Sequence, residues 1–435
     1  MPTTVQPAAK RFESLDFVRG CAVFGILLMN VAGMGLGNHA WDDPTVDGGA
    51  TGINLWTWLV VNISFEGTQR GLFSLLFGAG VILLTSRLEA TGKADTSDIF
   101  FRRNLWLIGF GLVNAWVLLW PGDILYWYGI TAFFLYAFRK LTGRTLLVIG
   151  GAVLLLGALW SLSEAREMIG THRLKVAAEK VELGARSEEQ KAAIEEWNES
   201  SAKPTATELA EERHVRTASY ASAHAELAPR IRKMESTFFY RYFGDVFGMI
   251  MIGMALFRLG ILTLEAKTRT YQAMMAGGYA IGVTGNVLEA RWMMDHGFSA
   301  ISYAQAAVSY DLSRVAMTIG HLGLIMLFLR SGILPWLRRS MAAVGRMALT
   351  NYLSHSLAAL IFFVLLGYFG TLQRHQLYYF VAAVWLFQMV TSPIWLRHFH
   401  YGPVEWLWRS LTYGKAQPFR TDVPPSAQQP ERLAV

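Results

Sequence analysis

The chain has 435 residues and a net charge of +7, and 53% of its residues are hydrophobic while only 16% are charged. Soluble domains carry about 25% charged residues, so this composition excludes an ordinary water-exposed surface and indicates a membrane protein. The single cysteine, Cys21, excludes an intramolecular disulfide and a cysteine-based metal cluster. We therefore expect no metal. We also expect no nucleic-acid partner, because no basic stripe with interleaved aromatic residues is present.

Apolar segments recur along most of the chain, and a membrane-spanning helix needs about 20 mostly apolar residues. The candidate spans are 17–36, 55–84, 104–120, 124–138, 145–162, 239–257, 271–288, 315–329, 347–369 and 376–395. The segment 55–84 is interrupted by Glu66, Gln69 and Arg70, and we count it as one broken crossing. The sequence therefore predicts an all-α, polytopic integral membrane helix bundle with about ten transmembrane helices.

Basic residues gather in alternate loops. They precede the first helix at Lys10 and Arg11, and they recur in the loops 87–103, 139–144, 258–269 and 338–339 and in the tail after residue 400. Lysine and arginine are enriched in cytoplasmic loops. If the segment 55–84 crosses once, all these clusters lie on the cytoplasmic side, together with both termini. Two crossings there would break the alternation.

The chain divides into four parts by composition. We predict N-terminal transmembrane helices in 1–162, a charged helical extracytoplasmic insert in 163–236, C-terminal transmembrane helices in 237–400, and an amphipathic cytoplasmic helix with a tail in 401–435. The runs EEQKAAIEEW and ATELAEERHVR in the insert have helix-forming composition with mixed charges. The insert either caps the bundle as a helical hairpin or is a tolerated insertion with no catalytic part.

The first predicted helix contains the most chemically informative residues. Asp16 and Arg19 are three residues apart, so they can pair on one helix face, or Arg19 can hold a phosphate or carboxylate of a ligand. Asn30 lies near the end of this helix, and the glycines that follow allow the chain to curl back and bring His39 to the same cavity. Histidine carries protons near neutral pH, although a histidine in such a loop can also be merely structural or solvated.

Charged residues also interrupt later spans, where they are energetically costly and usually line a cavity or pair with each other. Glu66 and Arg70 have the i,i+4 spacing of a local ion pair. Arg314 and His321 lie seven residues apart on one face of a single span. Asp123 stands with Tyr126 and Tyr128 beside Pro121–Gly122 at an outer helix end, where an ordinary interfacial belt explains the tyrosines.

Two dense polar segments lie near the C-terminus. GRMALTNYLSHS, from Gly345 to Ser356, places several polar groups in the opening of a span, where they need partners inside the bundle or a ligand; Asn351, Tyr352 and His355 are among them. GPVEWLWRSLTYG, from Gly402 to Gly414, is predicted to form a short amphipathic helix on the membrane surface. In that helix the four-residue spacing of Glu405 and Arg409 predicts an ion pair.

These motifs resemble the YeiB-like family, labelled domain of unknown function 418. The similarity rests on LDFVRGCAVFGILLMN near the start and on the two C-terminal segments. The resemblance implies membership of a superfamily of transmembrane acyltransferases that includes heparan-alpha-glucosaminide N-acetyltransferase. Asp16, Arg19 and Gly20 match the D-x-x-R-G motif that opens those enzymes, Asn30 matches an asparagine near the end of the same helix, and His39 resembles their catalytic histidine.

The resemblance implies transfer of an acyl group, with acetyl the first expectation, from cytoplasmic acetyl-CoA or another acyl-CoA to a hydroxyl or amine. The acceptor would be a small molecule or glycan at the outer face of a bacterial inner membrane. His39 would act as general base, Asn30 would orient it or stabilise an oxyanion, and Arg19 would meet the CoA phosphates. A homo-oligomer stays open.

Two other functions stay open. In a transporter or flippase, Glu66, Arg314, His321 and the polar cluster 350–356 would line a substrate pathway. In a non-catalytic scaffold, the insert 163–236 would carry the function. No GxxxxGK[ST], HExxH, DxD or GxSxG motif supports ATP-driven pumping, a metalloprotease, a metal-dependent glycosyltransferase or a serine hydrolase.

Overall fold

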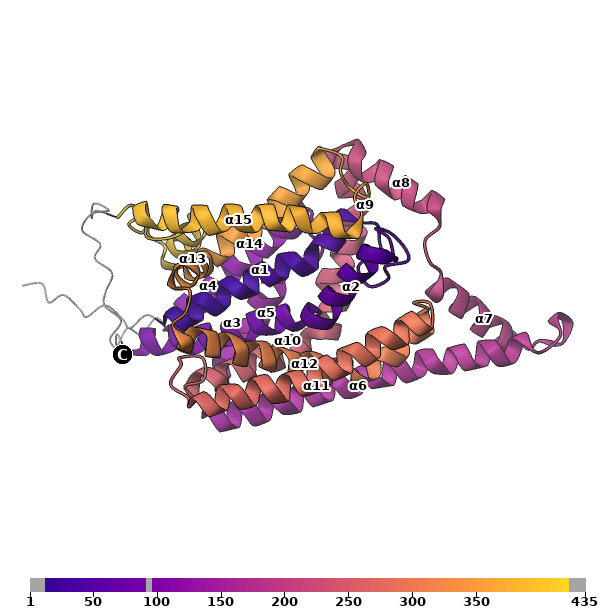
Figure 1. Ribbon diagram of the computed structural model, residues 1–435, viewed down its shortest axis with the longest axis horizontal. Helices are drawn as coiled ribbons and strands as arrows, with labels where there is room; N and C mark the ends of the chain where they lie inside the picture. The colour runs from indigo at the N-terminus through magenta and orange to yellow at the C-terminus, as the bar shows by residue number, and fades with distance from the viewer. Residues whose placement is uncertain (1–11, 91–95, 422–435) are drawn as a thin grey trace, which may run out of the picture.

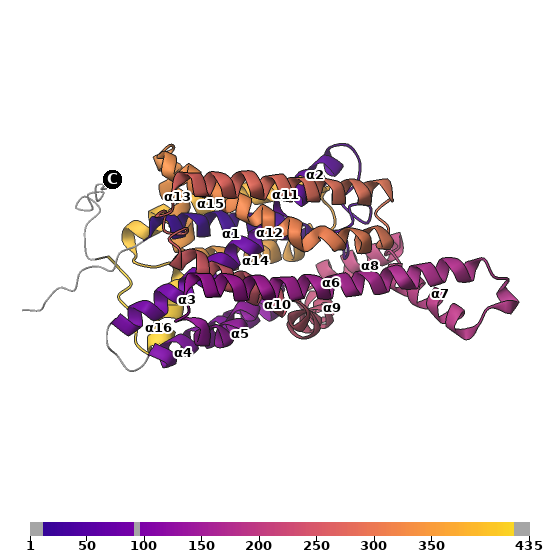
Figure 2. The ribbon, with the colours of Figure 1, turned by 90° about the horizontal axis from the view of Figure 1, so that it is seen from below.

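The computed structural model describes residues 12–90 and 96–421, and these residues form helices and loops without a β-strand. Most helices run along the long axis of the molecule, and the helices α13 (Pro335–Arg346) and α16 (Pro403–Tyr413) lie at one end of the bundle (Figures 1 and 2). At the opposite end, α8 (Ala206–Ala218) and α9 (Tyr220–Lys233) cover the bundle. The molecule is an all-α helical membrane bundle, as the composition predicts.

The remaining helices follow in chain order. They are α1 (Glu13–Gly35), α2 (Gly52–Phe65), α3 (Thr68–Ala90), α4 (Thr96–Leu112), η1 (Val113–Val117), α5 (Leu125–Leu135), η2 (Tyr136–Phe138), α6 (Gly143–Glu179), η3 (Leu183–Ala185), α7 (Glu188–Ser201), η4 (Met234–Phe238), α10 (Phe239–Arg258), α11 (Thr268–Asp295), α12 (Ala300–Ser331), α14 (Ala348–Ala359), η5 (Leu360–Leu365) and α15 (Arg374–His398).

Six helical segments are long and apolar enough to cross a membrane. They are Glu13–Gly35, Gly52–Ala90, Gly143–Glu179, Ala300–Ser331, Ala348–Leu365 and Arg374–His398. The helices α4, α5, α10 and α11 lie alongside them in the bundle (Figure 2). The exact number of crossings, ten by sequence, stays a prediction.

The interruption predicted in 55–84 is a real break between α2 and α3. Gly67 adopts a φ of +66°, a left-handed conformation that favours glycine. A Cβ atom at this position would lie 2.2 Å from Cδ of Arg314, so the break also makes room for that arginine. The chain therefore changes direction at the depth where Glu66 and Arg70 project, and this break sets the local shape of the site.

The helix α1 is largely buried, and its D-x-x-R-G motif has a packing role. A Cβ atom on Gly20 would lie 2.2 Å from the carbonyl oxygen of Met341, and one on Gly345 would lie 1.8 Å from that of Asp16. The two glycines thus allow α1 and α13 to cross with their backbones in contact. Asp16 and Arg19 form the predicted pair, with 3.1 Å between Oδ1 and the guanidinium nitrogen.

The insert is helical, as predicted, but it does not begin at a break in the chain. The helix α6 runs without interruption through residue 163 to Glu179, because the charged sequence after the apolar stretch is equally helix-forming. The helix α7 folds back along α6, with the rings of His172 and Trp197 4.6 Å apart. The helices α8 and α9 then return to the bundle and cover its outer end (Figure 1).

Candidate functional site: two opposed cavities

A polar cavity of about 550 Å³ opens between α1, the break between α2 and α3, α10, α11 and α12; we call it the outer cavity. Its ionisable and amide side chains include Asn30, Asp42, Glu66, Gln69, Arg70, Asp123, Asn286 and Glu289, and its aromatic walls include Trp41, Phe65, Trp127, Phe238, Tyr242, Tyr303 and Tyr310. The loop-charge argument predicts that this cavity faces away from the cytoplasm. It combines hydrogen-bonding groups with flat apolar surfaces.

Glu66 projects into the outer cavity from the break between α2 and α3. The hydroxyl of Tyr310 donates to Oε1 of Glu66 at 3.0 Å, and Nε1 of Trp41 donates to Oε2 at 3.5 Å. The predicted local pair between Glu66 and Arg70 is wrong. Because Gly67 interrupts the helix between them, the i,i+4 geometry is lost and Arg70 pairs elsewhere.

Arg70 and Arg314 share one carboxylate, Asp245 of α10, which the sequence analysis missed. Oδ2 of Asp245 lies 3.2 Å from Arg70, and Oδ1 accepts a hydrogen bond from Arg314. Only 2% of the Arg314 side chain is exposed, and Asp311 lies 3.6 Å from it as a second, weaker partner. The signal for Asp245 was a single acid in the apolar run 243–256.

A second cavity of about 230 Å³ lies at the end where α13 and α16 are found; we call it the inner cavity. Its charged side chains are Arg19, Arg103, Arg346 and Glu405. The rest is mainly apolar, from Phe73, Leu76, Phe77, Val81, Leu84, Phe100, Leu107, Leu125 and Leu349. The predicted orientation puts this cavity on the cytoplasmic side, with three arginines on a narrow apolar pocket.

The walls of the two cavities meet at Asp123 and Tyr352. Asp123 lines the outer cavity and Tyr352 the inner one, and the Tyr352 hydroxyl donates to Oδ1 of Asp123 at 3.4 Å. The same hydroxyl accepts the backbone N–H of Ile124 at 3.3 Å. Nearby, the hydroxyl of Tyr128, also on the inner cavity, donates to the carbonyl of Arg70 at 3.2 Å. A single layer of side chains therefore separates the cavities.

Tyr128 does not belong to an interfacial belt, and Asp123 near it is buried as well. Asp123 is 4% exposed and Tyr128 is fully buried, because the loop 118–124 folds inward instead of lying at the surface. Burial raises the pKa of Asp123 to about 7, although hydrogen bonds from the Tyr126 N–H, Asn114 and Tyr352 lower it. This carboxyl therefore changes its protonation near neutral pH, which its sequence context did not indicate.

Asn30 and His39 are not brought together. Asn30 lines the outer cavity, but His39 lies exposed in the loop that follows α1, with a φ of +69°, and is not among the residues lining either cavity. The loop does curl back after α1, as the glycines predict. The residues of this loop that line the outer cavity are Trp41, which contacts Glu66, and Asp42.

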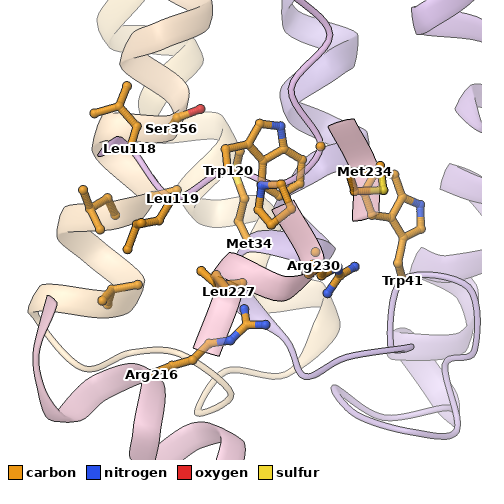
Figure 3. A pocket seen from close by; sticks show the side chains of 16 residues that line it. Met34, Trp41, Leu118, Leu119, Trp120, Arg216, Leu227, Arg230, Met234 and Ser356 are labelled. Atoms are coloured by element: carbon orange, nitrogen blue, oxygen red, sulfur yellow. The ribbon is translucent and has the colours of Figure 1, made fainter. Parts of the chain in front are cut away.

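The insert holds this loop in place. Glu212 of α8 accepts the backbone N–H of Asn38 at 3.0 Å, and Arg216 donates to the Asn38 side chain at 3.2 Å. A small pocket of about 70 Å³ lies beneath α9 and is lined by Trp41, Trp120, Arg216, Arg230 and other residues (Figure 3). The helices α8 and α9 thus cap the outer end beside the outer cavity.

Several predicted cavity residues are packed inside the bundle instead. Asn351 donates to the Val344 carbonyl at 3.0 Å, and Nε2 of His355 lies 3.1 Å from Gln388 of α15, which also bonds to the Asn351 carbonyl. These contacts join α14 to α15. His321 packs edge-on between the rings of Phe65 and Tyr279, at 5.8 and 5.5 Å. The need for internal partners was predicted, but these side chains line neither cavity.

The predicted ion pair between Glu405 and Arg409 is wrong. Glu405 accepts the backbone N–H groups of Leu349 at 2.6 Å and Thr350 at 3.0 Å, so it caps the start of α14. Arg409 lies over the rings of Tyr401 and Tyr413, at 5.1 and 5.3 Å. A carboxylate at a helix N-terminus satisfies free N–H groups and complements the helix dipole, so this arrangement competes successfully with a surface ion pair.

Replacing Glu405 by alanine should lower the free energy of unfolding by about 2 kcal/mol, because two N–H groups and the Thr350 hydroxyl lose their acceptor. Arg409→Ala is the matched comparison and should cost less, about 0.5–1 kcal/mol, for the loss of its contacts with the Tyr401 and Tyr413 rings. Thermal unfolding of the purified protein in detergent measures both. Equal losses of stability in the two variants would instead indicate that Glu405 and Arg409 form the predicted ion pair.

The fold defines an all-α helical membrane protein with a cavity toward each end of the bundle. The model of the family described as "Protein of unknown function (DUF418)" matches residues 256–415. The uncharacterized protein YeiB of Escherichia coli (strain K12) is 31% identical over 425 residues, which cover 94% of this chain and 98% of that protein. The chain belongs to this YeiB-like DUF418 family.

A second relative has a similar extent. The uncharacterized protein YxaH of Bacillus subtilis (strain 168) is 28% identical over 433 residues, covering 96% of this chain and 98% of that protein. No solved structure matches this chain. Both relatives are therefore similar to this chain over nearly its whole length.

Proposed function

We propose that this protein is a membrane-embedded acyltransferase of the bacterial inner membrane. It takes an acyl group from cytoplasmic acyl-CoA and passes it to a hydroxyl or amine at the outer face. The observation that carries the proposal is the meeting of the two cavity walls at the contact between Tyr352 and Asp123. A donor held in the inner cavity and an acceptor held in the outer cavity need only meet at this thin layer, and neither has to cross the membrane.

The inner cavity suits a CoA thioester. Arg19 and Arg103 line it beside Arg346, and guanidinium groups bind phosphates with paired, charge-assisted hydrogen bonds. Beyond them the lining is apolar down to Leu125 and Tyr352, which suits the uncharged pantetheine arm and the acyl group. Arg103 is held in place because its guanidinium lies over the Trp408 ring, 3.6 Å from the ring centroid.

The outer cavity suits a polar acceptor. Its carboxylates and amides can accept and donate hydrogen bonds to several hydroxyl or amine groups, while Trp41 and Tyr310 offer flat surfaces for an apolar ring face. The transporter alternative relies on Glu66, Arg314, His321 and the cluster 350–356. Glu66 lines the outer cavity and Tyr352 the inner one, while His321, Asn351 and His355 are packed between helices and line neither.

Binding of acyl-CoA tests the proposal. Purified protein in detergent should bind acetyl-CoA or octanoyl-CoA in calorimetry, and Arg19→Ala or Arg103→Ala should each weaken binding about tenfold to a hundredfold, because one charge-assisted phosphate contact contributes about 1.5–3 kcal/mol. Arg102→Ala is the matched control, since Arg102 lies outside the inner cavity and pairs with Asp98. His39→Ala should also bind normally. If well-folded wild type binds neither thioester, the transferase proposal fails and transport becomes the better explanation.

A further inference from the structure

We propose that Asp123 and Tyr352 form the proton-handling pair of this transferase, with Asp123 as general base toward the acceptor and Tyr352 as proton donor to the departing CoA sulfur. This inference rests on the proposed function and adds the residues at which transfer takes place. It replaces His39, which lies exposed outside both cavities, as the base.

The position of Asp123 sets it apart from the other carboxylates of the outer cavity. Glu66 bonds to Tyr310 and Trp41, and Glu289 accepts from Ser309 and Ser313, so both are engaged within the outer half of the bundle. Asp123 instead contacts a side chain that lines the inner cavity. Of the carboxylates that line the outer cavity, Asp123 is therefore the one placed against the wall of the inner cavity.

Asp123 is also rigidly held. Asn114 donates to its Oδ1 at 2.7 Å, and the Tyr126 N–H donates to its Oδ2 at 2.8 Å. Asn114 lies in the π-helix η1 and is fully buried, and its carbonyl accepts the N–H of Trp120 at 3.1 Å, which closes the turn that leads to Asp123. A base that is fixed before the substrate arrives needs little reorganisation during the reaction.

Burial and hydrogen bonds are the causes that set the pKa of Asp123. Tyr352 of α14 is the titratable side chain in contact with it. Other charged groups that line the same cavity are Arg70, whose charge is matched by Asp245, and the acids Glu66, Asp42 and Glu289. The pKa of about 7, raised by burial, is suited to a base that must accept and release a proton near neutral pH.

In the proposed transfer step, the acyl group moves from the CoA sulfur to the acceptor. The oxygen or nitrogen of the acceptor forms a bond to the thioester carbonyl carbon, and Asp123 takes the proton of that attacking atom. The carbon–sulfur bond breaks, and Tyr352 gives its hydroxyl proton to the departing sulfur. Asp123 then returns its proton to Tyr352 along their hydrogen bond, so both side chains regain their starting states. The acyl group ends on the acceptor and free CoA thiol ends on the cytoplasmic side.

The test is release of free CoA thiol from acetyl-CoA by the full-length protein in lipid nanodiscs, with water and ethanolamine as acceptors. Asp123→Asn should lower turnover about a hundredfold or more while acetyl-CoA binds within twofold of wild type, since general acid–base catalysis contributes about 10²–10⁴-fold. Tyr352→Phe should also lower turnover. Asp295→Asn and Tyr379→Phe, both exposed, are the matched controls and should behave as wild type.

The pH profile separates catalysis from mere structure. Because the carboxylate form is the active one, wild-type turnover should fall with decreasing pH below about 7, where Asp123 becomes protonated, and this limb should disappear in Asp123→Asn. Asn114→Ala and Tyr352→Phe each remove a hydrogen bond that lowers the pKa of Asp123, so both should move the limb to higher pH.

The outcomes are distinguishable. Lack of acetyl-CoA binding by wild type would overturn the transferase proposal itself. Normal binding with undiminished turnover in Asp123→Asn, an unmoved pH limb in Asn114→Ala, or no turnover by a wild type that binds acetyl-CoA would overturn the role of the pair and leave the donor site standing.

Discussion

Replacing Asp245 by alanine should abolish the folded protein or lower its stability by about 3–5 kcal/mol, because the change leaves the buried Arg314 and the partly buried Arg70 without their shared carboxylate. The side chain of Arg314 is 2% exposed, so water cannot replace the lost partner. Arg70, which lines the outer cavity, would lose its ion-pair partner at the same time. Size-exclusion profiles and thermal unfolding in detergent measure the loss.

Two matched variants identify the cause. Asp311→Asn removes the more distant and more exposed carboxylate, 3.6 Å from Arg314, and should cost less than about 1 kcal/mol. The triple variant Arg70→Met, Asp245→Leu, Arg314→Met should recover much of the stability, since apolar residues of similar volume often replace a buried ionic triad without loss. A stable Asp245→Ala protein would show that the arginines find other partners.

The sequence predicted those features that depend on local spacing. The apolar segments gave the membrane bundle, and the three-residue interval between Asp16 and Arg19 gave their ion pair on one helix face. The interrupted stretch 55–84 gave the break between α2 and α3, because charged residues at such depth seldom lie in a regular lipid-facing helix. Each of these inferences needs only neighbours within one or two turns.

The sequence failed where partners come from distant helices. Arg70 takes Asp245 from α10 in place of Glu66, and Glu405 takes the start of α14 in place of Arg409. The spacing of charges in one helix cannot reveal a stronger partner elsewhere. Asp123 was judged by its interfacial neighbours, yet its burial and its contact with Tyr352 arise only when α14 packs against its loop.

The orientation of the His39 side chain also depends on distant residues and could not be predicted from local spacing. The glycines after α1 correctly predict that the chain turns, but the side chain that enters the cavity depends on how the loop is held. Two arginines and a glutamate of the insert hold it by the adjacent residue, Asn38. The sequence of the loop alone contains no information about these contacts, since they come from 174 to 192 residues further along the chain.

Replacing Arg216 by alanine should release the loop 37–47 and the helices α8 and α9 from each other. Arg216 is 4% exposed and pairs with Glu212 at 2.9 Å and Glu226 at 2.7 Å, while its guanidinium lies 4.5 Å from the centre of the Phe369 ring. Its loss removes the cation that bridges two partly buried carboxylates and leaves Arg230 as a neighbouring positive charge. Breaking such a buried pair costs about 3–5 kcal/mol.

Hydrogen–deuterium exchange measures this release directly. Amides in 36–43 and 206–218 should exchange about a hundredfold faster in Arg216→Ala, because about 3 kcal/mol of local stability is lost. Arg232→Ala on α9 is the matched control, since Arg232 is exposed and its removal should leave exchange unchanged. Faster exchange confined to the insert, with the loop still protected, would mean that Asp47, which accepts the Gly37 N–H at 3.0 Å, is sufficient to hold the loop beside the outer cavity.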